Sequence, residues 1–415
     1  MRLPGTATPK RLAALIGGRA AFRGTMLLAN LVLLAVWGAT DYAGYAQAMG
    51  SMAFLAPLAS IGIEKCALKL IPRLRHTVGS LVGVFVTLAG LLFLVALAVL
   101  GTVLAVGRPE AWLLAGLAGL YMICVGVNQV LLGLARALGR PGRDVANHLV
   151  LCVALACWTG AAAFLDATPT VFLALCATTT AVLNVVALVL LRPRFGGLRR
   201  RSLVRAAVGT SLLMSVADLV GGLSMSLLFV ALSVSGAQAE STGLYLASAA
   251  SSVLLNAFSY LLRILQPDVS RSLHQRDLTA AYDRLSRWLR LLVLAGTPYV
   301  LTVLGVALAV LRPYGGVGVV IVYIACVPVI FAAGSANYMM ENASTEALTA
   351  TAAGAAVSLL AVAALAFLTV PLAGALGAVT VLAFGELVHA AMILRWLRSR
   401  RAPSPRLVPG REHAR

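Results

Sequence analysis

Long apolar runs separated by short polar segments make up most of this chain of 415 residues. Each run has about 20 residues or more, the length that a helix needs to cross roughly 30 Å of hydrocarbon. The runs cover residues 20–38, 43–63, 78–106, 111–135, 145–165, 170–191, 208–234, 242–264, 288–311, 315–337, 348–370 and 373–394. The pattern predicts an all-α polytopic membrane protein with about twelve transmembrane helices.

The composition excludes an ordinary soluble domain. Hydrophobic residues make up 60% of the chain and charged residues only 11%, whereas soluble domains have about 45–50% and about 25%. The six cysteines fall inside apolar runs or at their ends, without metal-ligand spacing, so we interpret them as small core residues.

The formal net charge is +19, and the positions of the positive residues along the chain indicate the membrane topology. If the N-terminus is cytoplasmic and the chain crosses the membrane twelve times, all but two of the 33 Lys and Arg residues lie on the cytoplasmic side. The exceptions are Arg108 and Arg312. We therefore expect a multi-pass membrane protein with both termini in the cytoplasm, attracted to anionic membrane lipids and binding no nucleic acid.

The loops leave little room for an enzyme. The expected outward loops have only a handful of residues each, so none can carry a loop-borne catalytic site. No G-x-x-x-x-G-K-[ST] pattern occurs, which argues against ATP use by this chain. The loop 338–348 differs from the other cytoplasmic loops because it contains two glutamates and no cation.

The two halves of the chain carry a similar segment. In 41–72 the pair Gly44 and Tyr45 opens the second span, and in 241–267 Gly243 and Tyr245 open the eighth. In each half an Ala- and Ser-rich stretch, a cation about 20 residues on and a proline follow. Six spans per half make the repeats parallel, which predicts two six-helix lobes related by a pseudo-two-fold axis along the membrane normal.

Three segments resemble the polysaccharide and O-antigen flippases, the polysaccharide biosynthesis and export proteins. They are GATDYAGYAQAMGSMAFLAPLASIGIEKCALKLIPR (38–73), GLYLASAASSVLLNAFSYLLRILQPDVSRSLHQRDLTAAYDRLSRWLR (243–290) and VPLAGALGAV (370–379). That family belongs to the multidrug, oligosaccharidyl-lipid and polysaccharide exporter superfamily. The resemblance implies a carrier that moves a polyprenyl-diphosphate-linked sugar across the cytoplasmic (inner) membrane of a bacterium by alternating access, with a polysaccharide polymerase or glycosyltransferases as partners.

The domain organisation expected from the spans and the repeat has five parts. They are an N-terminal arm (1–19), an N-terminal lobe (20–191), a basic linker (192–207), a C-terminal lobe (208–397) and a basic tail (398–415). The sequence departs from the family pattern at Phe229, where many relatives have an Asp, and in the acidic loop, where many have a basic one.

A diphosphate-linked substrate needs cations at the depth of the headgroups, and the arginine fork suits phosphate. Lys65 and Arg263 follow the repeat glycines by similar intervals and are near symmetry mates, so they are the first candidates to bind the diphosphate. Arg23 and Lys69 are further candidates. The alternative is that all four only anchor helix ends at the membrane surface.

An ion-coupled carrier needs an ionisable group inside the membrane. Asp218, near the middle of the seventh span, is the first candidate for proton or sodium coupling, and Glu386 with His389 in the twelfth is the second. Asn30 and Asn256 are candidate cavity residues for sugar hydroxyls, whereas most other intramembrane amides, such as Asn128 and Asn184, are expected to bond between helices. We expect no cofactor.

Two other functions fit the chain less well. A multidrug exporter of the same superfamily shares the fold, but would favour acidic cavities for cationic drugs, and intramembrane carboxylates are scarce here. A membrane-bound glycosyltransferase or ligase would need a large outward loop, which the sequence lacks.

Overall fold

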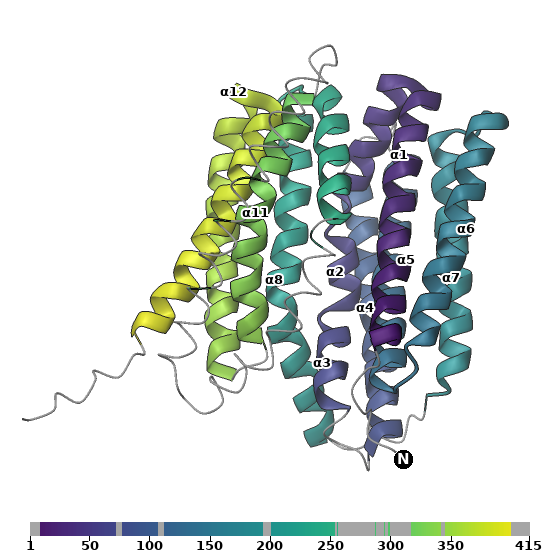
Figure 1. Ribbon diagram of the computed structural model, residues 1–415, viewed down its shortest axis with the longest axis vertical. Coiled ribbons are helices and arrows are strands. Elements are labelled where there is room, and N and C mark those ends of the chain that lie inside the picture. Colours follow the sequence, from purple (N-terminus) through teal and green to yellow (C-terminus); the bar gives the residue numbers. More distant parts are fainter. Residues whose placement is uncertain are drawn as a thin grey trace, which may run out of the picture.

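The computed structural model describes residues 9–71, 77–106, 112–193, 201–253, 317–341 and 345–399, with four isolated positions in 254–316. Within these ranges every regular element is a helix (Figure 1). Seven of the described helical stretches are long and apolar enough to cross a membrane, and α11 adds a shorter apolar one. The protein is an all-α polytopic membrane protein.

Helix α1 (Pro9–Ser51) contains two spans because it folds back at Gly38. The Tyr42 hydroxyl donates to Asn30 Oδ1 at 2.9 Å, although twelve residues of straight helix would separate the two by about 18 Å. Gly38 has φ 75° and ψ 175°, a backbone conformation that favours glycine. The reversal therefore ends the first span where the sequence predicts its end.

The second span is broken twice. After residues 52–54 the chain continues as α2 (Leu55–Ser60), and after residues 61 and 62 as α3 (Ile63–Leu70). Gly62 has φ +60°, and a Cβ there would overlap the backbone of Ser211 and Ser215 in another helix. The second break thus combines a glycine conformation with close helix packing.

Four further helices complete the N-terminal lobe. They are α4 (Val78–Val106), α5 (Trp112–Ala137), α6 (Gly142–Phe164) and α7 (Pro169–Leu191). Helix α7 begins with a proline after Thr168, whose hydroxyl caps the helix by accepting from the Val171 N–H. Helix α5 packs against α7 and α6 against α1.

The C-terminal lobe begins with α8 (Arg201–Val234), a 3₁₀ turn η4 (Gln238–Glu240) and a helix over 241–253. Helices α11 (Val317–Glu341) and α12 (Thr345–Ser399) follow. Helix α12 folds back at Gly374 (φ 56°), since the Ser358 hydroxyl donates to the Gly385 carbonyl at 2.7 Å, 27 residues along the chain. It therefore also contains two spans.

The described helices coincide with the expected spans one to seven and ten to twelve, and with the start of the eighth. The rest of the eighth span and the ninth lie outside the described residues. Several helices run past their apolar runs into flanking polar sequence: α1 begins inside the expected N-terminal arm, and α8 begins inside the expected linker 192–207. Backbone hydrogen bonds continue beyond the segment that lipid would cover.

The start of α1 and the end of α12 lie at the same end of the bundle, the lower end in Figure 1. We call this the basic end, because α3 with its two lysines and the start of α8 at Arg201 lie there (Figure 1), and the other the opposite end. One buried core joins both lobes, through residues such as Tyr45, Phe229 and Tyr245. A second, which includes Cys66, joins α3, α4, α5 and α8.

Candidate functional site

A cavity of about 370 Å³ lies inside the N-terminal lobe. Its wall comes from α1, α2, α3, α5, α6 and α7, and it is large enough for a small polar headgroup. The lining residues are Arg19, Phe22, Arg23, Met26, Ala56, Glu64, Tyr121, Met122, Val125, Asn128, Gln129, Leu132, His148, Leu151 and Thr180. We call this space the N-lobe cavity.

Two arginines of α1 line the N-lobe cavity. Arg19 and Arg23 are four residues apart, so they share one face of the helix, and Arg23 lies about 6 Å deeper along α1. Arg19 donates to Asp144 Oδ2 at 3.1 Å. The structure thus places the predicted candidate Arg23 on a cavity wall, together with a second guanidinium.

Asp144 is the centre of a buried charge cluster, with a side chain only 1% exposed. Its Oδ2 lies 3.1 Å from Arg19 and 3.3 Å from Arg136 Nε, and its Oδ1 lies 3.1 Å from His148 Nδ1. Arg136 also pairs with Glu64. These five residues, the Asp144 cluster, connect α1, α3, α5 and α6 beside the N-lobe cavity.

Three buried asparagines connect the helices at the side of the same cavity. Asn128 donates to Asn184 Oδ1 at 2.9 Å, and Asn147 donates to Asn128 Oδ1 at 3.0 Å. Asn184 in turn donates to the Cys124 carbonyl at 2.8 Å. The expectation that Asn128 and Asn184 bond between helices is confirmed.

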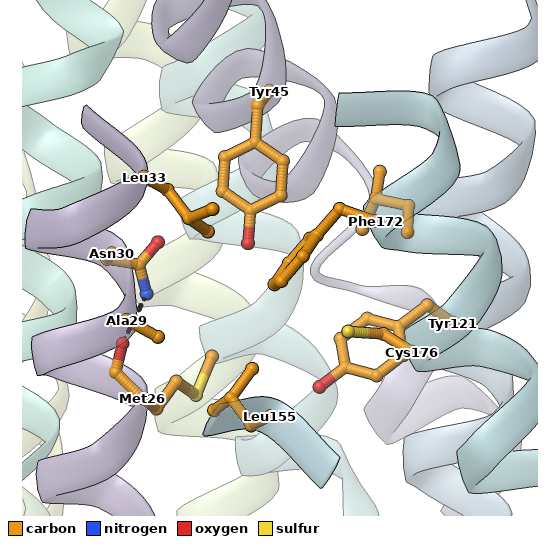
Figure 2. Close-up of a pocket in the computed structure, with 10 residues that line it drawn as sticks. Met26, Ala29, Asn30, Leu33, Tyr45, Tyr121, Leu155, Phe172 and Cys176 are labelled. Carbon is orange, nitrogen blue, oxygen red and sulfur yellow. Dashed lines mark hydrogen bonds between the residues drawn. The ribbon is translucent and has the colours of Figure 1, made fainter. Parts of the chain in front are cut away.

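A smaller pocket of about 10 Å³, room for roughly one water molecule, lies next to the N-lobe cavity and shares Met26 and Tyr121 with it. Figure 2 shows Tyr45 and Phe172 facing this pocket, with Asn30 on its wall. Asn30 is 2% exposed; it donates to the Met26 carbonyl and accepts from Tyr42. Its expected contact with a sugar stays a prediction.

Lys65 and Asp218 form an ion pair between the two lobes. Lys65 belongs to α3 and Asp218 to α8, and the Nζ atom lies 2.9 Å from the carboxylate. The side chains are 28% and 46% exposed. Two residues that the sequence assigns to different roles, diphosphate binding and ion coupling, are therefore direct partners.

The Lys65 side chain extends toward the middle of the bundle. Its neighbour Cys66 has its Sγ 3.6 Å from the Ala207 carbonyl, whereas Asp218 lies eleven residues further along α8, about 16 Å in a straight helix. A lysine that only anchors a helix end would extend the other way, toward the surface. The ion pair therefore lies deeper than the backbone of α3 at this point.

The lobes also meet nearer the opposite end, through neutral groups. The Gln47 amide donates to the Phe229 carbonyl at 2.7 Å, and the Ser241 hydroxyl donates to Gln47 Oε1 at 2.6 Å. The rings of Tyr45 and Tyr245, the tyrosines of the sequence repeat, are 5.7 Å apart and edge to face. Equivalent residues of the two halves thus meet each other.

Phe229, the departure from the family pattern, packs into this neutral contact. It is 1% exposed, and a Cβ at Gly50 would overlap its ring. A phenyl ring in place of a carboxylate makes this position part of the apolar contact between the lobes.

The predicted residues Lys69, Glu386 and His389 do not line the N-lobe cavity. His389 is buried in α12, with Nε2 3.2 Å from the Thr351 carbonyl, and Glu386 is half-buried on the same helix. Lys69 is half-buried on α3. Arg263 and Asn256 lie outside the described residues.

The sequence reasoning did not single out Arg19, Asp144, His148 or Arg136. The sequence indicates these residues only weakly, through the one-turn spacing of Asp144 and His148 at the start of an apolar run. The contacts that define the cluster span up to 125 residues, so only the packing of α1 against α6 reveals them.

Comparisons with known proteins place the fold. Family models and curated proteins give no match to the sequence. Among solved structures, an inward-facing MATE-family multidrug resistance transporter of the MOP superfamily aligns with TM-score 0.66 at 15% identity, covering 92% of this chain and 94% of that one. An outward-facing structure of such a transporter gives 0.58 at 15%, with 94% of each chain covered.

The lipid II flippase MurJ, in an inward closed conformation, aligns with TM-score 0.61 at 11% identity, covering 91% of this chain and 87% of that one. At these identities the likeness concerns the fold, which is that of two-lobed membrane transporters. The expected fold class is confirmed, and the neighbours are transporters, which fits a non-enzyme role.

Proposed function

We propose that this protein is a flippase that moves a polyprenyl-diphosphate-linked sugar across the cytoplasmic membrane by alternating access of its two lobes. The similarity to both transporters and a lipid flippase supports a carrier. The observation that favours a diphosphate substrate is the charge of the N-lobe cavity. Arg19 and Arg23 line it. Arg19 is paired with Asp144, and the one lining carboxylate, Glu64, with Arg136. Arg23 is therefore the cation that favours an anionic headgroup.

Electrostatics favours an anionic headgroup in such a cavity. Guanidinium groups bind phosphate oxygens through charge-assisted hydrogen bonds, and a partly enclosed site strengthens them. The amides of Asn128 and Gln129 and the ring of His148 line the same wall and can bind further oxygens. Arg23 is the residue that we assign to the diphosphate, with Lys65 and Arg263 as further cations.

The second candidate function is export of cationic drugs, which the MATE-family neighbours support. A site for a cation needs a carboxylate free of a cationic partner. Around the N-lobe cavity and at the contact between the lobes, Asp144, Glu64 and Asp218 each have an arginine or lysine partner. Glu386 lies in the C-terminal lobe and does not line that cavity. This pairing makes the anionic substrate the better proposal.

Ion coupling belongs to the same proposal. Asp218 is the candidate nearest to both lobes, and Glu386 with His389 is the alternative inside the C-terminal lobe. We place both termini in the cytoplasm, so that the part of α1 that carries Arg19 and Arg23 lies toward the leaflet in which lipid-linked sugars are made. A polymerase or glycosyltransferase is the expected partner.

Equilibrium binding tests the assignment of Arg23. Purified protein in lipid nanodiscs is titrated with a fluorescent polyprenyl-diphosphate sugar, as wild type, Arg23→Ala and Arg140→Ala. Arg140 is an exposed cation at the basic end and serves as the control for net charge. We expect Arg23→Ala alone to weaken binding about tenfold or more; equal affinities for all three proteins would refute the site.

A further inference from the structure

Asp218 carries the only charge in α8 between Ala206 and Val234. An isolated carboxylate in a membrane span is costly, so its presence calls for a functional reason. Lys65 compensates its charge from the other lobe at 2.9 Å. Both side chains are partly exposed, so the pair is not sealed by packing and a headgroup can reach it.

A carrier for lipid-linked diphosphates works among competing lipids. The surrounding bilayer consists largely of phosphodiester lipids, which also have acyl chains and an anionic headgroup and are in great excess. Cations such as Arg23 and Lys65 attract either kind of headgroup. Cations alone therefore cannot exclude the membrane's own lipids.

Asp218, the carboxylate beside Lys65, can discriminate between diphosphate lipids and phosphodiester lipids. A singly charged phosphodiester that took the place of Asp218 would exchange one anion for another and leave the carboxylate unpaired, so nothing is gained. A diphosphate brings a second negative charge, so its attraction to the Lys65 ammonium exceeds that of the single carboxylate it displaces. Only the doubly charged headgroup then offsets the loss of the resident pair.

We propose, building on the flippase function above, that Asp218 is a specificity-determining residue. Its ion pair with Lys65 keeps singly charged phospholipids from binding to Lys65, and a diphosphate headgroup displaces the carboxylate. The residue acts by repulsion and competition, as negative charges often do in selective sites. Its exchange also separates a contact between α3 and α8, so substrate entry loosens one of the contacts between the lobes.

The test compares two lipids in proteoliposomes. Transfer of fluorescent phosphatidylglycerol and of a fluorescent polyprenyl-diphosphate sugar is measured for wild type, Asp218→Asn and Asp166→Asn. Asp166 is an exposed aspartate in the turn before α7, so its variant removes the same charge elsewhere. We expect only Asp218→Asn to move phosphatidylglycerol, about tenfold faster than wild type.

Two outcomes separate this inference from the proposed function. If Asp218→Asn still transfers the diphosphate lipid but excludes phosphatidylglycerol as wild type does, the specificity role is wrong and the flippase function stands. If wild type does not transfer the diphosphate lipid, the flippase function itself fails. Asp218→Ser carries the same prediction should the asparagine variant not purify as a single species, and Asp218→Glu should keep the wild-type selectivity.

Discussion

The Asp144 cluster and the Lys65–Asp218 pair both join charges from different helices, but they differ in burial. Asp144 is 1% exposed and Arg136 8%, within the N-terminal lobe. Lys65 and Asp218 are 28% and 46% exposed, between the lobes. Asp144 and Arg136, at the centre of the cluster, cannot lose each other without leaving a charge in a poor solvent, whereas water or a headgroup can replace either partner of the exposed pair.

This difference in exposure indicates which charged residues can exchange partners during transport. An alternating-access cycle needs lobes that stay rigid and contacts between them that change. The buried cluster suits the first task, because it ties four helices of one lobe. The exposed pair suits the second, because its free energy is small and an anionic substrate can compete for it.

The largest effect should come from the buried cluster. Asp144→Ala leaves Arg19 and Arg136 without their shared carboxylate, so we expect a loss of about 3–5 kcal/mol of stability. Thermal unfolding of the detergent-purified protein measures it as a lowered Tm and a smaller monodisperse fraction. An unchanged Tm would show that the cluster is not a structural element.

Lys65→Ala should lower transport of the diphosphate lipid about tenfold, because a charge-assisted contact is lost. Lys69→Ala is the matched comparison one turn further along α3. We expect it to have the smaller effect, since Lys65 is the residue that pairs with α8. Initial transfer rates in proteoliposomes measure both effects. Equal rates for the two variants would show that Lys65 has no specific role in binding the diphosphate.

Asp218→Ala should change stability by less than about 1 kcal/mol, as expected for an exposed ion pair. The same thermal unfolding assay applies, run beside Asp144→Ala. A loss as large as that of Asp144→Ala would mean that the two clusters do not differ in the way their exposure indicates.

The smallest effect should be that of salt. Raising the ionic strength from about 0.1 M to about 1 M shortens the Debye length from roughly 10 Å to 3 Å and weakens exposed charge pairs. Spin labels at the exposed positions Leu68 and Leu212, in a cysteine-free background, report the distance between α3 and α8. We expect a modest broadening toward longer distances in wild type and none in Asp218→Asn.

Much of the fold was predictable because a membrane span has a simple physical signature. Runs of about 20 apolar residues located the described helices. The reversal at Gly38 lies where the first span was expected to end, and that at Gly374 lies at the expected start of the twelfth. The breaks in the second span were not predicted. Gly62 is conspicuous only once its contact with α8 is known.

The site was less predictable, because its contacts are distant in sequence. Lys65 and Asp218 were both candidates, yet 153 residues separate them and nothing local indicated that they pair. Asp144 was overlooked because a charge at the start of a helix is ordinary. Its burial and its partners depend on how α1, α5 and α6 pack, which no single segment encodes.

The most direct test of the central claim is translocation of a fluorescent polyprenyl-diphosphate oligosaccharide in proteoliposomes that contain only this protein, with and without a proton or sodium gradient. The account predicts transfer by wild type that Arg23→Ala lowers and Arg140→Ala leaves unchanged. Absence of transfer, together with gradient-driven efflux of a cationic dye from the same proteoliposomes, would contradict it and establish the drug-exporter function.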